Sequence, residues 1–201
     1  MSLLNFINSR PSSHANHQRN KRPISRFFDI MKNMAKLYIM CGYPFSGKSS
    51  IAQLLVNKLG AVRVALDDIN TERGIGVDVN LPITENEWLE SYTICNNRML
   101  DNLKAGKSVI ADTVAYKRAT RQALRALAKE ANTNSTILYV DTPVEVVRKR
   151  WEQNRLHKTR LDVSDENFSE VIKNFEIPIE VEKAIKITQN INQKKILQLV
   201  A

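Results

Sequence analysis

The sequence predicts an α/β fold in which helices cover both faces of a five-stranded parallel sheet, giving a three-layer sandwich. Stretches with strand patterns alternate along the chain with stretches of helical period, which is typical of a parallel sheet with right-handed connections. A glycine-containing turn over 42–47 also follows the first apolar run and precedes the first helical pattern. The chain of 201 residues is long enough for one such domain, which we expect to span 34–201.

The individual elements follow from apolar periodicity and from the glycines and prolines that interrupt it. Helical spacing after the turn stops at Gly60, which is a typical helix C-cap. The expected order is a strand at 37–41, a helix at 48–59, a strand at 61–65 that ends on 66–70, a loop at 71–84, a helix from 85 to 106, a strand at 108–111, a helix at 118–129, a strand at 136–140, helices at 144–152 and 165–175, a strand at 184–188 and a closing helix at 191–200.

The turn fits the phosphate-binding pattern G-x-x-x-x-G-K-[ST], the Walker A motif. In such a loop the backbone N–H groups surround a phosphate, the lysine reaches the β- and γ-phosphates, and the hydroxyl residue binds Mg²⁺. Here that lysine is Lys48 and the hydroxyl residue is Ser49, at the positive end of the predicted helix. The residues expected to bind the nucleotide are Gly42, Tyr43, Pro44, Phe45, Ser46, Gly47, Lys48, Ser49 and Ser50.

Charge is distributed unevenly along the chain. The net charge is +9, and residues 1–33 carry +5 of it. This leader is rich in Ser, Asn and Arg, has no apolar core of a secretory signal, and is expected to be loosely ordered. A transit peptide, a translated upstream extension, a basic arm that contacts nucleic acid or membrane, and a dispensable tail all remain open for it.

Composition also limits the compartment. No apolar run approaches the roughly 18 residues that span a bilayer, so we expect a soluble protein with no membrane partner. The two cysteines, Cys41 and Cys95, have neither disulfide nor metal spacing. They favour a reducing, cytoplasmic compartment in which both are buried thiols.

Two acids follow predicted strands and are candidates for chemistry. Asp67 comes 19 residues after Lys48, a position where a carboxylate could take the proton of an acceptor hydroxyl. Asp112 ends the 108–111 strand, where an acid could hold Mg²⁺ directly or through water. For both acids the alternative is a turn or capping role.

Basic residues gather after the fourth strand and predict a small arginine-rich lid over about 149–165. A guanidinium there could neutralise charge on a phosphoryl group in transfer. Arg155 and Arg150 are the favoured candidates, although a run of charges is more often a solvated face. The basic residues of this stretch are Arg148, Lys149, Arg150, Arg155, Lys158 and Arg160.

These motifs resemble the small P-loop kinases, a group that includes the 5′-kinase domain of polynucleotide kinase, zeta-toxin-type kinases and antibiotic phosphotransferases. The resemblance covers about residues 36–188. It rests on the runs 40–49, 67–68, 109–113 and 141–143, followed by Arg150 and Arg155. It implies a P-loop NTPase fold and an ATP- and Mg²⁺-dependent transferase. By that likeness Lys48 and Ser49 bind nucleotide and metal, Asp67 is the base, Asp112 organises substrate or metal, and Arg155 is the lid arginine.

One departure from the group bears on the substrate. Polynucleotide kinases usually have an arginine three residues after the base, where this chain has Asn70. A neutral amide cannot grip a phosphate as a guanidinium does. A small-molecule hydroxyl acceptor is therefore favoured over a polynucleotide 5′-hydroxyl, and an ATP-gated switch or binding module is a third hypothesis. A second departure is Phe45, where relatives often have glycine. The absence of a guanine-reading Asn-Lys-x-Asp motif favours ATP.

Overall fold

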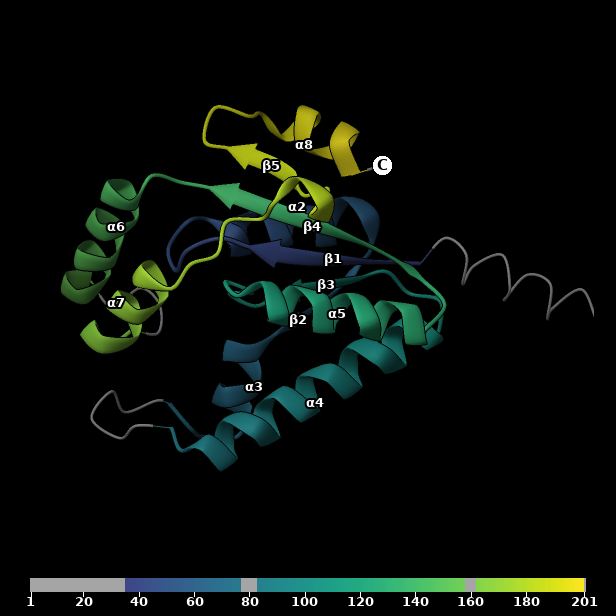
Figure 1. Ribbon diagram of the computed structural model, residues 1–201, viewed down its shortest axis with the longest axis horizontal. Helices are drawn as coiled ribbons and strands as arrows, with labels where there is room; N and C mark the ends of the chain where they lie inside the picture. The colour runs from purple at the N-terminus through teal and green to yellow at the C-terminus, as the bar shows by residue number, and fades with distance from the viewer. Residues whose placement is uncertain (1–34, 77–82, 158–161, 201) are drawn as a thin grey trace, which may run out of the picture.

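A computed structural model describes residues 35–76, 83–157 and 162–200 of the chain. All strand pairs in its five-stranded sheet are parallel, and the strand order is β2-β3-β1-β4-β5. The predicted fold class is therefore confirmed (Figure 1). The strands are β1 (Lys36–Cys41), β2 (Val62–Ala65), β3 (Val109–Asp112), β4 (Asn134–Asp141) and β5 (Ile185–Thr188).

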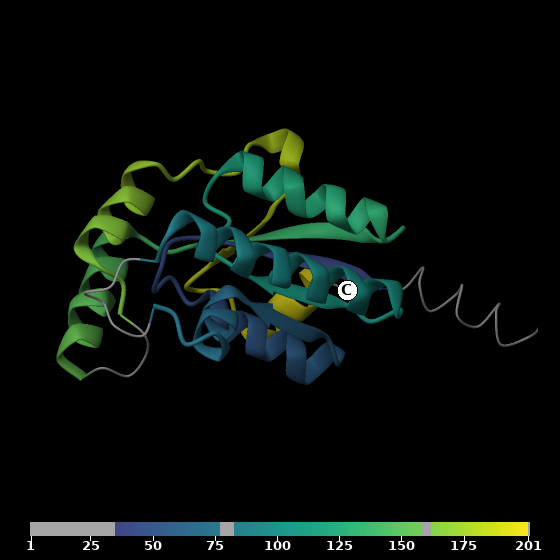
Figure 2. The same ribbon diagram turned by 90° about the horizontal axis from the view of Figure 1, so that it is seen from below.

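Helices cover both faces of the sheet, as the view from below shows (Figure 2). Helices α4 and α5 lie on one face, and α2 and α8 lie on the other. The helices are α2 (Lys48–Leu59), α3 (Leu66–Glu72), α4 (Glu85–Lys104), α5 (Arg118–Glu130), α6 (Val144–His157), α7 (Asp165–Lys173) and α8 (Gln193–Val200), with a 3-10 turn η1 (Glu180–Glu182).

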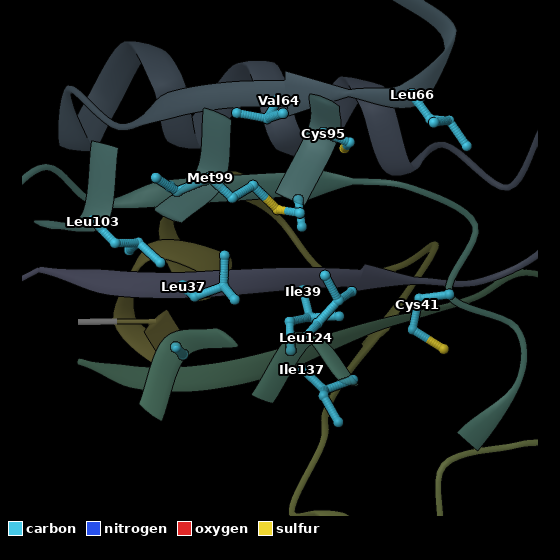
Figure 3. Close-up of a cluster of buried hydrophobic side chains, with 14 of the residues drawn as sticks. Leu37, Ile39, Cys41, Val64, Leu66, Cys95, Met99, Leu103, Leu124 and Ile137 are labelled. Carbon is cyan, nitrogen blue, oxygen red and sulfur yellow. The ribbon is translucent and has the colours of Figure 1, made fainter. Parts of the chain in front are cut away.

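The central strand β1 shows why the sheet is a middle layer. Alternate side chains of a strand point to opposite faces, and in β1 both sets are apolar. Leu37, Ile39 and Cys41 are buried in the cluster that α4 and α5 complete (Figure 3). Tyr38 and Met40 are buried in the cluster of α2 and α8. A strand that is apolar on both sides is stable only when helices cover both sides.

One element differs from the sequence-based prediction. Residues 66–70 were expected to be the end of a strand, and that expectation is wrong: they form most of α3. Leu66 and Ile69 are buried three residues apart on one side of this short helix, while Asp67 and Asp68 occupy its first turn. Acidic residues are favoured at that end of a helix by its dipole. The expected loop at 71–84 accordingly begins later, and residues 77–82 lie outside the described part of the chain.

Helices α6 and α7 lie beyond the ends of the strands (Figure 1), and we call this pair the lid after the prediction. Trp151 of α6 stacks on Phe168 of α7 with a centroid separation of 4.2 Å and an interplanar angle of 3°. Of the predicted lid of about 149–165, residues 149–157 belong to α6 and residues 162–165 lead into α7, and its action as a lid stays a prediction. The described residues do not include 158–161 or the predicted leader 1–33.

A buried ion pair joins the segment after the lid to α5. The Arg121 guanidinium donates from Nε and Nη2 to the two carboxylate oxygens of Glu182, at 2.8 and 2.9 Å. Both side chains are almost fully buried, and the bond from Arg121 lowers the pKa of Glu182 despite burial. Paired in this bidentate way, the two charges satisfy each other where water cannot.

Candidate active site

The candidate site lies at one edge of the sheet because all strands are parallel. Their carboxyl ends meet at that edge, where ligands of open α/β sheets usually bind. The loop after β1 carries the Walker A motif, and Ala65 at the end of β2 pairs in register with Asp112 at the end of β3. The sheet therefore brings three predicted site segments together: the loop 42–49, the start of α3 and the end of β3.

Two glycines allow the loop its shape. Gly42 has φ +149°, and a Cβ there would lie 2.7 Å from the carbonyl oxygen of Val140, so the chain can pass β4 only without a side chain. Gly47 has φ +104° and is the N-cap of α2. Its positive φ turns the chain sharply into the helix, so the N-terminus of α2 faces the loop.

The tertiary structure explains Phe45, which stands where related kinases often have glycine. Its φ of 61° is in the left-handed region, which costs a non-glycine residue about 1 kcal/mol. Its ring is buried with Val147, Trp151 and Phe168 of the lid. Burying a phenylalanine ring contributes about 2 kcal/mol, which offsets the strain and joins the phosphate loop to the lid.

Polar contacts also attach the top of the loop to its neighbours. The carbonyl oxygen of Ser46 accepts hydrogen bonds from Thr142 Oγ1 at 2.9 Å and from Arg150 Nη1 at 3.3 Å. Arg150 Nη1 also donates to the carbonyl oxygen of Phe45 at 3.1 Å. Of the two arginines that the sequence favoured, Arg150 is thus the one on the phosphate loop.

The predicted phosphate ligand, Lys48, lies inside the loop. Its side chain is buried, and Nζ donates to the carbonyl oxygens of Gly42 at 3.1 Å and Tyr43 at 2.6 Å. These bonds hold the ammonium group over the concave side of the loop. A β- or γ-phosphate bound in the loop would be within reach of it. Ser49 and Ser50 follow in the first turn of α2.

Arg63 is a site residue that the sequence analysis missed. From β2 its Nε donates to Asp112 Oδ2 at 2.7 Å and its Nη1 donates to Asp68 Oδ2 at 2.6 Å. Burial lowers the pKa of Arg63, but its bonds to the two carboxylates outweigh burial and raise it overall. The Asp112 side chain is only 4% exposed, so this guanidinium is what makes its charge tolerable there. In the sequence, the only sign of this role was that a charged residue, Arg63, interrupts the apolar pattern of the strand predicted at 61–65.

Asp67 lies in the first turn of α3 and is exposed. The phenol of Tyr92 in α4 is affected by its charge, and by that of Tyr116 in the β3–α5 loop. Burial raises the pKa of Tyr92, and the charges of Tyr116 and Asp67 raise it further. Tyr116 donates to Glu170 Oε1 of the lid at 3.3 Å. The predicted base is therefore close enough to Tyr92 of α4 for its charge to act on that phenol.

Asn70, the position that weakened the polynucleotide hypothesis, has a packing role. Its side chain is buried, and Asn70 Oδ1 accepts from Ser91 Oγ at 2.6 Å. Arg73 in turn donates to Ser91 and Glu90. This series of hydrogen bonds attaches α3 to α4. Asn70 therefore joins the two helices, at the position where polynucleotide kinases usually have a phosphate-binding arginine.

Arg155 makes its described contacts within the lid. Its guanidinium lies 4.2 Å from the ring centroid of Trp151, and it pairs with Asp165 at 2.8 Å and Asp162 at 3.5 Å. These side chains are one third or more exposed, apart from Asp162 at 30%, so each ion pair contributes less than about 1 kcal/mol. The structure thus separates the two candidate arginines.

We predict that Arg155→Ala lowers kcat more than it lowers ATP affinity, because a guanidinium from the lid acts when charge builds on the transferring phosphoryl group. Steady-state kinetics with ATP titrations would measure both. Asp165→Asn is the matched control, since it removes the shorter of the two ion pairs and leaves the guanidinium. Equal losses of kcat and melting temperature in both variants would show that Arg155 only holds the lid together.

A cavity of about 650 Å³ opens beside the phosphate loop, on the side of α6 and β5. Pockets of this size accommodate drug-sized ligands. Its walls come from the loop and the start of α2, the end of β4, helix α6, strand β5, the segment after β5 and helix α8. The principal residues are Gly47, Arg150, Gln153, His157, Gln189 and Ile191.

Metal-binding residues are few at this edge. Within the described ranges, no three His, Cys, Asp or Glu side chains gather to hold an ion. Ser49 and Asp112 offer the oxygen atoms that Mg²⁺ prefers, and one Asp112 oxygen is already bonded to Arg63. An ion there would take most of its ligands from phosphate and water, as Mg²⁺ usually does.

The described helices include none long and apolar enough to cross a bilayer.

Comparisons with known proteins agree with this geometry. The family model described as an AAA domain, AAA_33, matches residues 37–178, more than two thirds of the chain. Shikimate kinase of Persephonella marina is 26% identical over 66% of this chain and 79% of that protein. L-seryl-tRNA(Sec) kinase of Methanococcus maripaludis is 28% identical over 57% of this chain and 44% of that protein. The chain therefore matches less than half the length of the second relative.

A solved structure gives the same fold. APS kinase of Mycobacterium tuberculosis, in complex with AMPPNP and APS, superposes with a TM-score of 0.60 at 18% identity, over 83% of this chain and 95% of that chain. At this identity the likeness concerns the fold alone. The match of the family model over most of the domain identifies the chain as a member of the AAA_33 family of P-loop kinases.

Proposed function

We propose that this chain, which belongs to the AAA_33 family, is an ATP- and Mg²⁺-dependent kinase that transfers the γ-phosphoryl group to a hydroxyl of a small molecule. The observation that carries the proposal is the convergence of four segments at one edge of the sheet. They are the loop with Lys48, the first turn of α3 with Asp67, the end of β3 with Asp112, and Arg150 of the lid.

In the proposed reaction the acceptor hydroxyl lies between Asp67 and the γ-phosphate. The hydroxyl proton passes to the Asp67 carboxylate as the acceptor oxygen bonds to the γ-phosphorus, and the bond from that phosphorus to the β,γ-bridging oxygen breaks, releasing ADP. Lys48 and Arg150 stabilise the negative charge on the phosphate oxygens. Ser49 and Asp112 would hold Mg²⁺, which supplies further charge neutralisation when bound.

The cavity of about 650 Å³ beside Gly47 is the proposed place of the adenosine moiety. It adjoins the phosphate loop on the side away from Asp67, so the nucleoside and the acceptor would approach the γ-phosphate from different sides. Gln153, His157 and Gln189 supply polar groups to an otherwise partly apolar wall. A site of this composition suits a ring with hydrogen-bonding edges.

Filling this cavity gives a direct prediction. Ile191→Trp should raise KM for ATP by about 10-fold or more, with kcat changed much less, because a substitution that blocks nucleoside binding removes uniform binding energy. Steady-state kinetics at saturating acceptor would measure both constants. Ile177→Trp is the matched control, since Ile177 is 60% exposed and outside the cavity. An unchanged KM for ATP in Ile191→Trp would remove the nucleoside from this cavity.

A substrate screen tests the proposal as a whole. ATP consumption would be measured with panels of sugars, nucleosides, aminoglycosides, hydroxy acids and 5′-hydroxyl oligonucleotides, and phosphorylated products would be identified by mass spectrometry. We expect one class of small alcohol to stimulate ADP release strongly, with Lys48→Ala as the inactive control. If no acceptor stimulates turnover while ATP still binds, the ATP-gated switch becomes the better hypothesis.

An acceptor attached to RNA is the second candidate. It is favoured by the likeness to a protein named L-seryl-tRNA(Sec) kinase. In that case the phosphorylated group would be a small alcohol and the recognised molecule would be the RNA that carries it. The screen distinguishes the two candidates, since only the RNA-linked acceptor loses its rate when the RNA is digested before the reaction.

A further inference from the structure

A buried arginine of α5, Arg121, joins three segments of the chain. Its Nη1 donates to the carbonyl oxygens of Ala115 and Tyr116, at 3.2 Å each, in the loop after β3. The same Nη1 lies 3.9 Å from Sγ of Cys41, the last residue of β1 before the phosphate loop. Its Nε and Nη2 bind the carboxylate of Glu182 in η1. One side chain therefore contacts the end of β1, the β3–α5 loop and η1.

The β3–α5 loop has a strained backbone at the point where Arg121 binds it. Ala115 has φ 35°, in the left-handed region, which is unfavourable for a residue with a Cβ. Ala115 is also buried, so its carbonyl oxygen needs a donor from the protein, and Arg121 supplies one. This loop begins directly after Asp112, the proposed Mg²⁺ residue. Loss of the guanidinium would therefore allow the chain after Asp112 a different path.

The segment between α7 and η1 is attached to the same loop. The backbone N–H of Glu176 donates to the carbonyl oxygen of Tyr116 at 3.0 Å. The preceding residue, Phe175, has its ring centroid 4.4 Å from that of Tyr43 in the phosphate loop. The ion pair fixes the far end of the segment at Glu182, whose carboxylate also accepts from a backbone N–H of the segment at 3.1 Å. Direct contacts thus connect the ion pair, the β3–α5 loop and the phosphate loop.

We propose that Arg121 and Glu182 are positioning residues for phosphoryl transfer, an inference that rests on the proposed kinase function. Through their contacts they hold the loop after Asp112 and the segment with Phe175 in the arrangement that the reaction requires. Both side chains are at most 5% exposed, so neither contacts the substrate itself. Burying two charges is costly, and apolar residues of similar volume often stabilise a fold equally well. Apolar side chains could not, however, donate to the carbonyl oxygens of the β3–α5 loop.

The test replaces the pair by apolar residues of similar volume, Arg121→Met/Glu182→Leu, in the full chain. At saturating ATP and acceptor, kcat should fall by about 10-fold or more, because a small displacement of the reacting groups is enough for such a loss. The dissociation constant of ATP, measured by calorimetry, should change little, since Lys48 keeps its bonds within the phosphate loop. Lys104→Met/Glu130→Leu is the matched control: it removes an exposed ion pair between α4 and α5 and should leave kcat near that of the wild type.

Two further measurements separate positioning from stability. Leu103→Ala truncates a fully buried side chain near the end of α4, so it should lower the melting temperature and leave kcat near that of the wild type while the protein is folded. Amide hydrogen exchange should become faster over 113–118 and 174–182 in the double variant and stay unchanged in α2. Arg121→Lys is used if the double variant does not fold. Lysine keeps the charge but lacks the planar group that reaches Glu182 and both carbonyl oxygens at once, so kcat should still fall.

The outcomes separate this inference from the proposed function. Wild-type kcat in the double variant, or unchanged amide exchange in both segments, would overturn the inference. So would a loss of kcat that Leu103→Ala reproduces at the same melting temperature. Failure of the proposed function looks different, because the wild type itself would then phosphorylate no acceptor. In that case amide exchange alone decides whether the pair orders the two segments.

Discussion

Replacing Lys48 by alanine should reduce phosphoryl transfer by about 10³-fold or more and should weaken ATP binding, while the protein remains folded. The ammonium group lies inside the loop, bonded to the carbonyl oxygens of Gly42 and Tyr43. In a Walker A loop this lysine is the side chain that reaches the β- and γ-phosphates. Its removal would leave the phosphate with the backbone N–H groups of the loop, Arg150 and the metal. Calorimetry with ATP and a coupled turnover assay would measure the two effects.

Folding of the Lys48→Ala variant is expected to be normal because the helix start does not depend on this side chain. Gly47 caps α2, and the loop is attached through Phe45 and the Ser46 carbonyl oxygen. Lys58→Ala, at the exposed far end of the same helix, is the control for a lysine lost from α2. Full turnover and unchanged ATP affinity in Lys48→Ala would show that nucleotide binds somewhere else.

Asp67→Asn should lower transfer by about 10²–10⁴-fold, the range typical of losing a general base, and should leave ATP binding near that of the wild type. The carboxylate lies exposed in the first turn of α3, outside the phosphate loop. Asparagine keeps the size and a hydrogen-bond acceptor but cannot take the proton. Single-turnover rates with the acceptor found by screening would isolate this step.

The adjacent acid provides a matched control for this prediction. Asp68→Asn removes one carboxylate from the same helix turn, but Asp68 is bonded to Arg63, and its side chain is 55% exposed. Its loss should lower transfer far less than that of Asp67. If the two variants are equally impaired, or if Asp67→Asn loses ATP binding in proportion to activity, then the acids of this turn organise the site or its metal and Asp67 is not the base.

Much of the fold could be predicted because its information is local. Strand and helix patterns along the chain gave all five strands and most helix positions, since alternation and helical spacing reflect which faces are buried. The short helix α3 was missed because a single turn of apolar spacing, Leu66 to Ile69, is too brief to distinguish from the end of a strand. Packing of Asn70 against Ser91 of α4 supports the helix, and that contact spans 21 residues.

The candidate site also has features that the sequence predicts and features that only the folded structure shows. The phosphate loop was predictable because its function depends on backbone conformation, and glycines at 42 and 47 encode that conformation directly. The role of Phe45 was not, because its strained φ is offset only by burial against the lid, about 100 residues later in the chain. Asp112 was expected near a metal, and the structure adds that Arg63, 49 residues away, holds its charge.

The sequence by itself determined the parallel sheet, the phosphate loop and the two acids near its carboxyl edge, because periodicity and glycine positions act on neighbouring residues. The tertiary structure decided which distant charges meet. Arg150 contacts Phe45 of the phosphate loop, 105 residues earlier in the chain. Arg155 instead pairs with Asp165 and lies over the ring of Trp151. Both arginines belong to one helix and one charge cluster, so no local pattern separates them. Only the packing of α6 against the loop on one side and α7 on the other gives each its partner.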